Sequence, residues 1–147
     1  MSSHRPARRR VRCAALAVLV LALAPAGARG SGGAPDFGPN VKVFDPSMPT
    51  AQIKAAVDAI AARQVPDQFG DGRFALLFKP GTYGSPTDPL NFQVGYYTDV
   101  AGLGDSPDDV TINGTVDAFN QCDAAGSCTA LTNFWRSVSN LRIAVAS

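Results

Sequence analysis

Apolar residues follow a helical period in one segment of the chain. Ile53, Val57 and Ile60 are spaced i, i+4 and i+7, which puts them on one face of a helix, and alanine fills much of the remainder. Thr50 stands where an N-cap residue is expected, and Pro66 interrupts the pattern at the other end. The sequence therefore predicts one helix of about 13 residues between these two positions.

Short apolar runs in the rest of the chain are typical of β-strands. Residues 41–44 (VKVF) predict a strand before the helix. Residues 73–78 (RFALLF) predict a strand that is buried on both faces, because few polar residues interrupt it. Residues 79–83 (KPGTY) are expected to form a turn. Weaker strand signals lie at 92–94, 96–97, 110–112 and 141–143, and turn signals at 102–104, 105–107, 113–114 and 139–140.

A single early helix followed only by strands indicates a mainly β fold. The stronger strands are separated by about 15–35 residues, which is compatible with the coils of a solenoid. In such a solenoid the helix would cap the open end, which otherwise exposes unpaired backbone groups and apolar surface to water. A two-sheet β-sandwich is the alternative, since it also consists of short strands and turns.

Charge is distributed unevenly along the chain. Residues 1–30 contain six arginines and no acidic residue, whereas residues 31–147 contain seven basic residues and twelve aspartates, a balance of 7 − 12 = −5. The basic start is followed by 12 apolar residues at 13–24 and by small residues up to Ala28, a pattern typical of a secretory signal peptide. This apolar stretch is shorter than the roughly 20 residues that span a bilayer.

These signals predict three regions. We expect a signal peptide at 1–28, with cleavage after Ala26 as the alternative to cleavage after Ala28. A flexible segment rich in Gly and Pro follows at 29–40, and the remaining residues, 41–147, form the folded body. The mature protein is then secreted and no longer contacts a membrane.

The composition of the body excludes several classes of function. Its acidic balance argues against a nucleic-acid-binding surface, which needs clustered Lys and Arg. The single histidine, His4, lies in the predicted signal peptide, so the body cannot form a Ser-His-Asp triad.

The two cysteines of the body, Cys122 and Cys128, are separated by a short insert of turn-forming residues. Export would place them in an oxidising compartment, which predicts a disulfide. A metal or redox pair is the alternative, but Cys-x5-Cys is not a redox spacing and no further Cys or His completes a zinc site.

A series of motifs carries a resemblance to known proteins. After the predicted helix and buried strand comes PGTY at 80–83, followed by VAGLG at 100–104, VTING at 110–114 and NLRI at 140–143. In this order the chain resembles the N-terminal entry of right-handed parallel β-helices of the pectin-lyase-like superfamily. Over residues 37–147 it is similar to secreted bacterial proteins related to the family-55 glucanases.

The resemblance implies the start of a right-handed parallel β-helix with one N-terminal capping helix. It also implies a carbohydrate-active protein, a polysaccharide hydrolase or lyase, that acts on a polysaccharide or cell-wall glycan. In such proteins the active residues lie on later coils of a much longer domain, so we expect this chain to be an N-terminal fragment without activity of its own. The alternative is a non-catalytic solenoid that is secreted and binds glycans or belongs to the cell surface.

Aromatic side chains are the candidate sugar-binding residues. Tyr96, Tyr97 and Trp135 could stack on sugar rings, because aromatic faces bind apolar sugar surfaces. Packing in the core or in a stack of turns is the alternative role for these rings. Arg136 could contact an acidic sugar or pack beside Trp135.

Acidic residues are densest at Asp105, Asp108 and Asp109. Carboxylate oxygens are ligands that Ca²⁺ prefers, so this group is the candidate metal site, and a solvated turn is the alternative. No other cofactor is expected. Glycoside hydrolysis requires a pair of carboxylates at a defined distance, and the sequence gives no such distance, so no catalytic residue is assigned.

Overall fold

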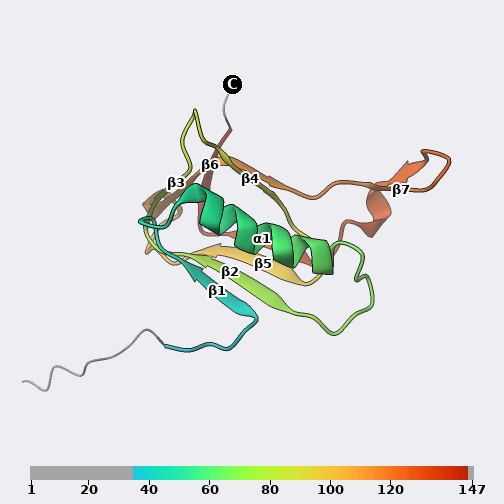
Figure 1. The fold of residues 1–147 in the computed structure, drawn as a ribbon, viewed down its shortest axis with the longest axis horizontal. Coiled ribbons are helices and arrows are strands. Elements are labelled where there is room, and N and C mark those ends of the chain that lie inside the picture. Colours follow the sequence, from blue (N-terminus) through green and yellow to red (C-terminus); the bar gives the residue numbers. More distant parts are fainter. Residues whose placement is uncertain (1–34, 146–147) are drawn as a thin grey trace, which may run out of the picture. The chain divides into compact units, whose positions relative to one another are not determined.

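The computed structural model describes residues 35–145. The predicted signal peptide at 1–28 lies outside the described residues, as does the first part of the segment rich in Gly and Pro. The described part is mainly β, with parallel sheets and one α-helix that lies against the strands (Figure 1).

Helix α1 (Thr50–Gln64) is the predicted helix, and it is slightly longer than expected. Pro49 occupies the N-cap position and no side chain caps the helix, so the prediction of Thr50 as N-cap is wrong. Proline is suited to a helix start because it lacks the backbone N–H, which would have no partner there in any case. No helix within residues 35–145 is long and apolar enough to cross a membrane.

The apolar face of α1 packs into the core, with Ile53, Val57 and Ile60 buried. At the end of the helix, the buried Gln64 donates from its side chain to the Tyr96 carbonyl at 2.8 Å, and its own carbonyl accepts from the Tyr96 N–H at 2.9 Å. These two hydrogen bonds fix the end of the helix to the chain segment that leads into the sheet.

One of the two four-stranded sheets is entirely parallel and has the order β1-β2-β5-β9. Its strands are β1 (Val41–Phe44), β2 (Phe74–Phe78), β5 (Thr98–Gly102) and β9 (Arg136–Ser139). Each neighbour in this order comes from the next passage of the chain, so the order in the sheet is the order in the sequence.

A second set of parallel pairs is centred on β6 (Val110–Asp117). The first half of β6 lies between β3 (Gly81–Tyr83) and β10 (Arg142–Ala144), and its second half pairs with β4 (Leu90–Gln93). The sandwich alternative consists of antiparallel sheets. The parallel pairing of these strands argues against it and is consistent with the start of a β-helix.

Residues 113–114 were predicted as a turn, and this prediction is wrong because they lie inside β6. They mark the point where β6 passes from the β3–β10 pairing to the β4 pairing. Gly114 has a φ of 151°, and a Cβ there would collide with the Leu90 carbonyl. The backbone therefore requires glycine at position 114, because β6 bends there within the strand.

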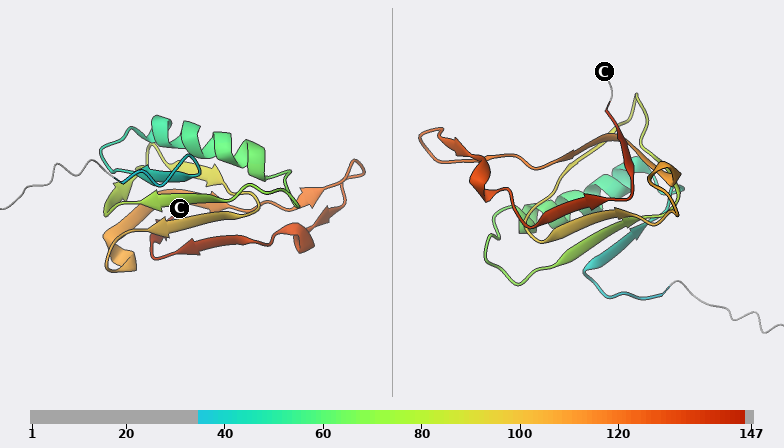
Figure 2. Two further views of the ribbon diagram at one scale, coloured as in Figure 1. Left: turned by 90° about the horizontal axis from the view of Figure 1, so that it is seen from below. Right: turned by 180° about the vertical axis from the view of Figure 1, so that it is seen from behind.

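The excursion between β6 and β9 carries a small antiparallel hairpin, β7 (Gln121–Cys122) and β8 (Cys128–Thr129). The predicted disulfide between Cys122 and Cys128 is confirmed and closes this hairpin. Both views in Figure 2 show the hairpin extending beyond the ends of the main strands. Short 3₁₀ turns at Pro107–Asp109 and Ala130–Thr132 complete the elements.

Two predictions about the strand region need correction. In β2 only Phe74, Leu76 and Phe78 are buried, and the alternate residues are half-buried, so the strand is not buried on both faces. The expected turn at 79–83 is already strand β3 from Gly81 onward. The alternation arises because one face of the sheet packs on the core while the other borders the solvent.

Aromatic rings pack together in one part of the core. The Phe78 ring packs on Phe44 and edge-on to Tyr83, with 4.9 Å between ring centroids in both pairs, and stacks on Phe92 at 6.3 Å. The Tyr83 hydroxyl donates to the Phe44 and Lys79 carbonyls at 3.0 and 2.8 Å, so the buried polar group is satisfied.

Candidate functional site

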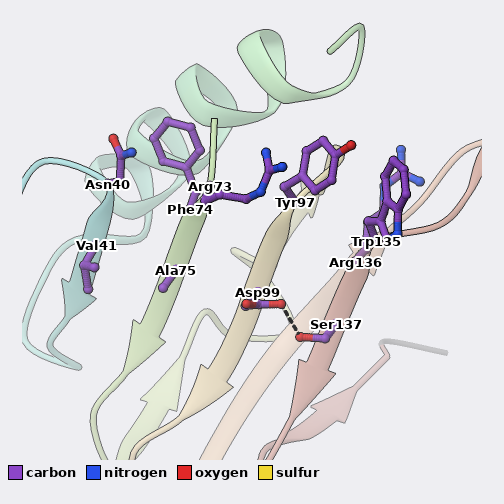
Figure 3. A pocket seen from close by; sticks show the side chains of 10 residues that line it. All are labelled: Asn40, Val41, Arg73, Phe74, Ala75, Tyr97, Asp99, Trp135, Arg136 and Ser137. Atoms are coloured by element: carbon purple, nitrogen blue, oxygen red, sulfur yellow. Dashed lines mark hydrogen bonds between the residues drawn. The ribbon is translucent and has the colours of Figure 1, made fainter. Parts of the chain in front are cut away.

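A groove of about 570 Å³ lies over the sheet β1-β2-β5-β9 (Figure 3). Four short side chains in register across the sheet lie at its base, one from each strand: Val41, Ala75, Asp99 and Ser137. Because these side chains are small, they leave room for a ligand above the strands.

One side of the groove is a ladder of three side chains, Arg73, Tyr97 and Trp135, each of which directly precedes a strand. The Arg73 guanidinium carbon lies 3.5 Å from the centroid of the Tyr97 ring. The Tyr97 and Trp135 rings stack with 4.8 Å between centroids and 19° between planes. The register of β2, β5 and β9 brings the three residues together from three successive passages of the chain.

The backbone holds both rings of the ladder in an unusual conformation. Tyr97 and Trp135 each have a φ of 55°, in the left-handed region that costs an L-residue roughly 1–2 kcal/mol. The Tyr97 N–H donates to the Trp135 carbonyl at 2.6 Å, and the Phe74 N–H donates to the Tyr97 carbonyl at 2.9 Å. The hydrogen bonds between neighbouring strands thus continue through these two left-handed residues. They offset part of the free-energy cost of the left-handed conformation.

Polar contacts fix the remaining atoms of the ladder. Arg73 donates to the carbonyls of Gly70 and Gly72 at 2.8 Å each, and the Tyr97 hydroxyl donates to the Gln68 carbonyl at 2.9 Å. The Trp135 side chain is oriented by Phe134, whose ring meets it edge-on at 4.5 Å. The stacked faces are therefore organised before any ligand arrives.

One acidic group lines this groove. The Ser137 hydroxyl donates to an Asp99 carboxylate oxygen at 2.6 Å, and both residues are exposed (Figure 3). Asp99 is the only carboxylate among the lining residues. Glycosidases of the usual kind use two carboxylates that flank the scissile bond, so the groove has the groups to bind a sugar but not to cleave it by that mechanism.

Comparisons with known proteins assign the chain to a wider group. No family model matches the sequence. An exo-β-1,3-glucanase from Streptomyces sp. (strain SirexAA-E / ActE) is 50% identical over 123 residues, which cover 81% of this chain and 18% of the relative. The chain is related to the family-55 glucanases.

Solved structures agree with this relationship. The structure of sacteLam55A from Streptomyces sp. SirexAA-E is 45% identical, with a TM-score of 0.60 over 76% of this chain and 19% of that one. A variant of sacteLam55A in complex with glucose is 46% identical, with a TM-score of 0.62 over 78% and 19% of the two chains. The resemblance to family-55 glucanases is confirmed, and the chain spans about a fifth of the length of these relatives.

The aromatic candidates for sugar binding in this glucanase relative divide into two groups. Tyr97 and Trp135 line the groove, and the Trp135 side chain is 52% exposed. Tyr96 is fully buried, so it cannot present a ring face to a ligand in this structure. Its ring packs edge-on to Phe134, and the Arg136 guanidinium lies 4.4 Å from its centroid. Both tyrosines lie in the turn before β5, so the weak strand signal at 96–97 does not correspond to a strand.

Arg136 is half-buried at the edge of the groove and is held by internal contacts. Its Nε donates to the Val94 carbonyl at 3.1 Å, and its Nη1 donates to the Thr132 carbonyl at 3.1 Å. Together with the contact to Tyr96, these bonds assign Arg136 the packing role that the sequence left as one of two options.

The three aspartates of the candidate calcium site lie at a capped 3₁₀ turn. The Asp109 carboxylate accepts from the Ser106 N–H at 2.8 Å, and the Ser106 hydroxyl accepts from the Asp108 N–H at 3.2 Å. Across residues 35–145 no three metal-ligating side chains gather into a group that could hold an ion. Calcium binding by Asp105, Asp108 and Asp109 stays a prediction, and the hydrogen bonds favour the alternative of a solvated turn.

Sequence reasoning missed Arg73, Asp99 and Ser137, which belong to the groove. Each is unremarkable in its own sequence neighbourhood. The signal that connects them is the strand register, which aligns residues from separate passages of the chain.

Proposed function

We propose that this chain forms the first coils of a right-handed parallel β-helix in an exported enzyme that hydrolyses β-1,3-glucan. The observation that carries the proposal is the 50% identity to an exo-β-1,3-glucanase over most of the chain. The likeness to a solved structure of sacteLam55A, with a TM-score of 0.60, supports the same fold. The predicted signal peptide at 1–28 supports export.

The strand pairing supports the β-helix. Each passage of the chain adds one strand to the sheet β1-β2-β5-β9, and the pairs β3–β6 and β6–β10 repeat this order in a second sheet. Stacked passages with parallel neighbours on more than one face are the arrangement of a solenoid. Helix α1 covers apolar core residues at the first passage, as a cap would.

The described residues contribute scaffold and binding surface, and hydrolysis belongs to other parts of the full-length enzyme. The groove offers one carboxylate, Asp99, where hydrolysis needs two. We therefore expect no sugar release by this chain alone.

A non-catalytic glycan-binding protein is the second candidate function. The groove favours it, because an organised aromatic ladder beside a lone carboxylate fits recognition without cleavage. The two candidates share the binding surface and differ in whether the chain can form part of a working hydrolase.

A chimera tests that difference directly. Residues 35–145 replace the matching segment of the Streptomyces exo-β-1,3-glucanase, and release of reducing sugar from β-1,3-glucan is measured. We expect the chimera to retain at least about a tenth of the parent rate, because the reacting groups come from the relative. The parent enzyme with the segment deleted serves as the inactive control.

A chimera that folds but releases no sugar would contradict the proposal that this segment belongs to a β-1,3-glucanase. Release of sugar by the purified chain alone would contradict the claim that hydrolysis lies elsewhere.

A further inference from the structure

The groove over β1-β2-β5-β9 has the two kinds of surface that a sugar chain requires. A pyranose presents apolar C–H faces and hydroxyl groups around its edge, so its binding sites combine aromatic faces with a few polar groups. Trp135 supplies a half-exposed ring at the start of β9. The exposed pair of Asp99 on β5 and Ser137 on β9 supplies hydrogen-bonding oxygens. The close view in Figure 3 shows the ring and the polar pair on the same two strands.

The strained backbone is a second, independent observation at the same place. Bulky residues seldom adopt a positive φ, and residues in such conformations cluster at functional sites. In residues 35–145 three non-glycine residues have a positive φ, and two of them, Tyr97 and Trp135, form the stacked pair of the groove. The hydrogen bonds and packing around Tyr97 and Trp135 hold the two rings stacked despite this strain, which reduces the ordering cost of binding.

The charges of the groove select a neutral ligand. Arg73 is the exposed cation of the groove, and the Tyr97 ring lies between its guanidinium and Trp135, whereas Arg136 is half-buried and bonded internally. Asp99 is the exposed charge at the base, and it would repel the carboxylates of a pectin-like polymer. A glucan carries no charge and avoids this repulsion.

The dimensions favour a chain over a single sugar. The groove crosses four parallel strands. With neighbouring strands about 4.8 Å apart, this distance is about 14 Å across the sheet, which exceeds the width of one pyranose ring.

We propose that this groove is a non-catalytic binding subsite for a neutral β-1,3-glucan chain, with Trp135 as the stacking platform and Asp99 and Ser137 as hydrogen-bonding partners of the sugar hydroxyls. The choice of β-1,3-glucan among neutral glucans rests on the proposed function, whereas the groove itself does not.

The composition of the chain provides a specific probe. Trp135 is the only tryptophan, so its fluorescence reports on the groove alone. The purified chain is titrated with β-1,3-glucan oligosaccharides, and with β-1,4- and α-1,4-linked glucan and oligogalacturonate as comparisons. We expect a saturable change in emission with the β-1,3 series and none with oligogalacturonate.

Variants locate the binding. Co-sedimentation with insoluble β-1,3-glucan is expected to weaken about tenfold or more in Trp135→Ala and by a smaller factor in Asp99→Asn. Phe119→Ala is the matched control, because Phe119 is an exposed aromatic residue outside the groove, and it should bind like the unaltered chain. Circular dichroism confirms that each variant is folded.

The proposal is overturned if the folded chain shows no emission change with any glucan, or if Trp135→Ala and Asp99→Asn bind as well as Phe119→Ala. It is also overturned if oligogalacturonate binds as tightly as β-1,3-glucan. The glucanase chimera separates this inference from the proposed function. If the chimera is active but the chain alone binds no glucan, only the proposed binding subsite is contradicted. If the chimera is inactive but the chain alone binds glucan, only the proposed function as part of a hydrolase is contradicted.

Discussion

Successive passages of the chain form layers that stack on one another, and these layers differ in how well their apolar side chains are covered. Leu76, Val100 and Val138 occupy one row across β2, β5 and β9, so their side chains point the same way. Leu76 and Val100 are at most 1% exposed, whereas Val138 is 46% exposed. The second sheet repeats the pattern, because Ile112 of β6 is fully buried and its register partner on β10, Ile143, is 37% exposed.

The difference shows that neighbouring layers, and not residue type or orientation, decide burial in this fold. The strand of Val100, β5, has a parallel neighbour on both sides. Within the described residues, the strand of Val138, β9, has a parallel neighbour on one side only. Stacked passages bury a side chain only when the next passage covers it. Equal residues at equal positions should therefore contribute unequally to stability, and each prediction below tests that inequality.

The largest effect is expected from the matched isoleucines. Ile112→Ala removes buried methyl groups from between β3 and β10 and should lower the free energy of unfolding by about 2–5 kcal/mol. Ile143→Ala, at the adjacent register position, should cost about 1 kcal/mol or less, because its side chain is already partly in contact with water. Urea denaturation of both variants measures the two values. Equal losses would contradict the role of neighbouring layers.

A smaller effect is expected from the hydroxyl of Tyr83, which lies in the same row as Ile112. Tyr83→Phe keeps the ring and removes the hydrogen bonds to the Phe44 and Lys79 carbonyls, so the loss should be about 1–2 kcal/mol. Burial of the hydroxyl, and then the Asp45 charge, raises the pKa of Tyr83, so it stays a donor over the usual pH range. Thr82→Ala, at the exposed neighbouring position, is the control and should change the midpoint little. The Phe44 carbonyl still accepts from the Lys79 N–H at 3.0 Å in this variant, so an unchanged free energy of unfolding would show that the Tyr83 hydroxyl contributes nothing beyond that bond.

The same comparison explains which features could be predicted from the sequence. Helix α1 and strand β1 depend on local periodicity, and the disulfide depends on two nearby cysteines, so all three were predictable. The burial of strand faces was only partly predictable, since β2 follows the alternation of a half-buried strand although all of its residues are apolar.

The candidate site was less predictable, because it depends on register. Tyr97 and Trp135 stood out as aromatic residues, but nothing local relates them to Arg73 or distinguishes Tyr97 from the buried Tyr96. Asp99 and Ser137 meet only because β5 and β9 pair in one particular register. A sequence pattern indicates on which face of a sheet a side chain lies. Which side chains lie next to it depends on how successive strands stack.

A local effect is expected in the hairpin, which extends away from both layers (Figure 2). Cys122→Ser with Cys128→Ser removes a loop closure worth roughly 2 kcal/mol to the hairpin itself. Both cysteines are exposed, so the global free energy of unfolding should fall by less than about 1 kcal/mol. Hydrogen exchange should accelerate at residues 121–129 and stay unchanged in β2 and β5. Faster exchange in those strands would show that the hairpin stabilises the covered layers.

The weakest effect is expected at the turn between β1 and α1, where the covering helix joins the first strand. The Ser47 N–H and hydroxyl, followed by the Lys79 ammonium, stabilise the Asp45 carboxylate and lower its pKa from 3.8 to about 2. Because the folded state has the lower pKa, this contribution is fully present above about pH 4 and is lost as the pH falls toward about 2. Asp45→Asn should therefore be slightly less stable than the unaltered chain at pH 7, and most of this difference in stability should be lost at pH 2.

Ser47→Ala separates the donors in this turn, because it keeps the backbone N–H while removing the hydroxyl that lies 2.7 Å from the Asp45 carboxylate. Its pH-dependent difference in stability from the unaltered chain should be smaller than that of Asp45→Asn and should diminish over the same range. Asp45 is exposed and the Lys79 contribution is screened by salt, so the effect should shrink further at high ionic strength. If the difference in stability between Asp45→Asn and the unaltered chain were as large at pH 2 as at pH 7, the turn would act through packing of the helix start and not through the charge of Asp45.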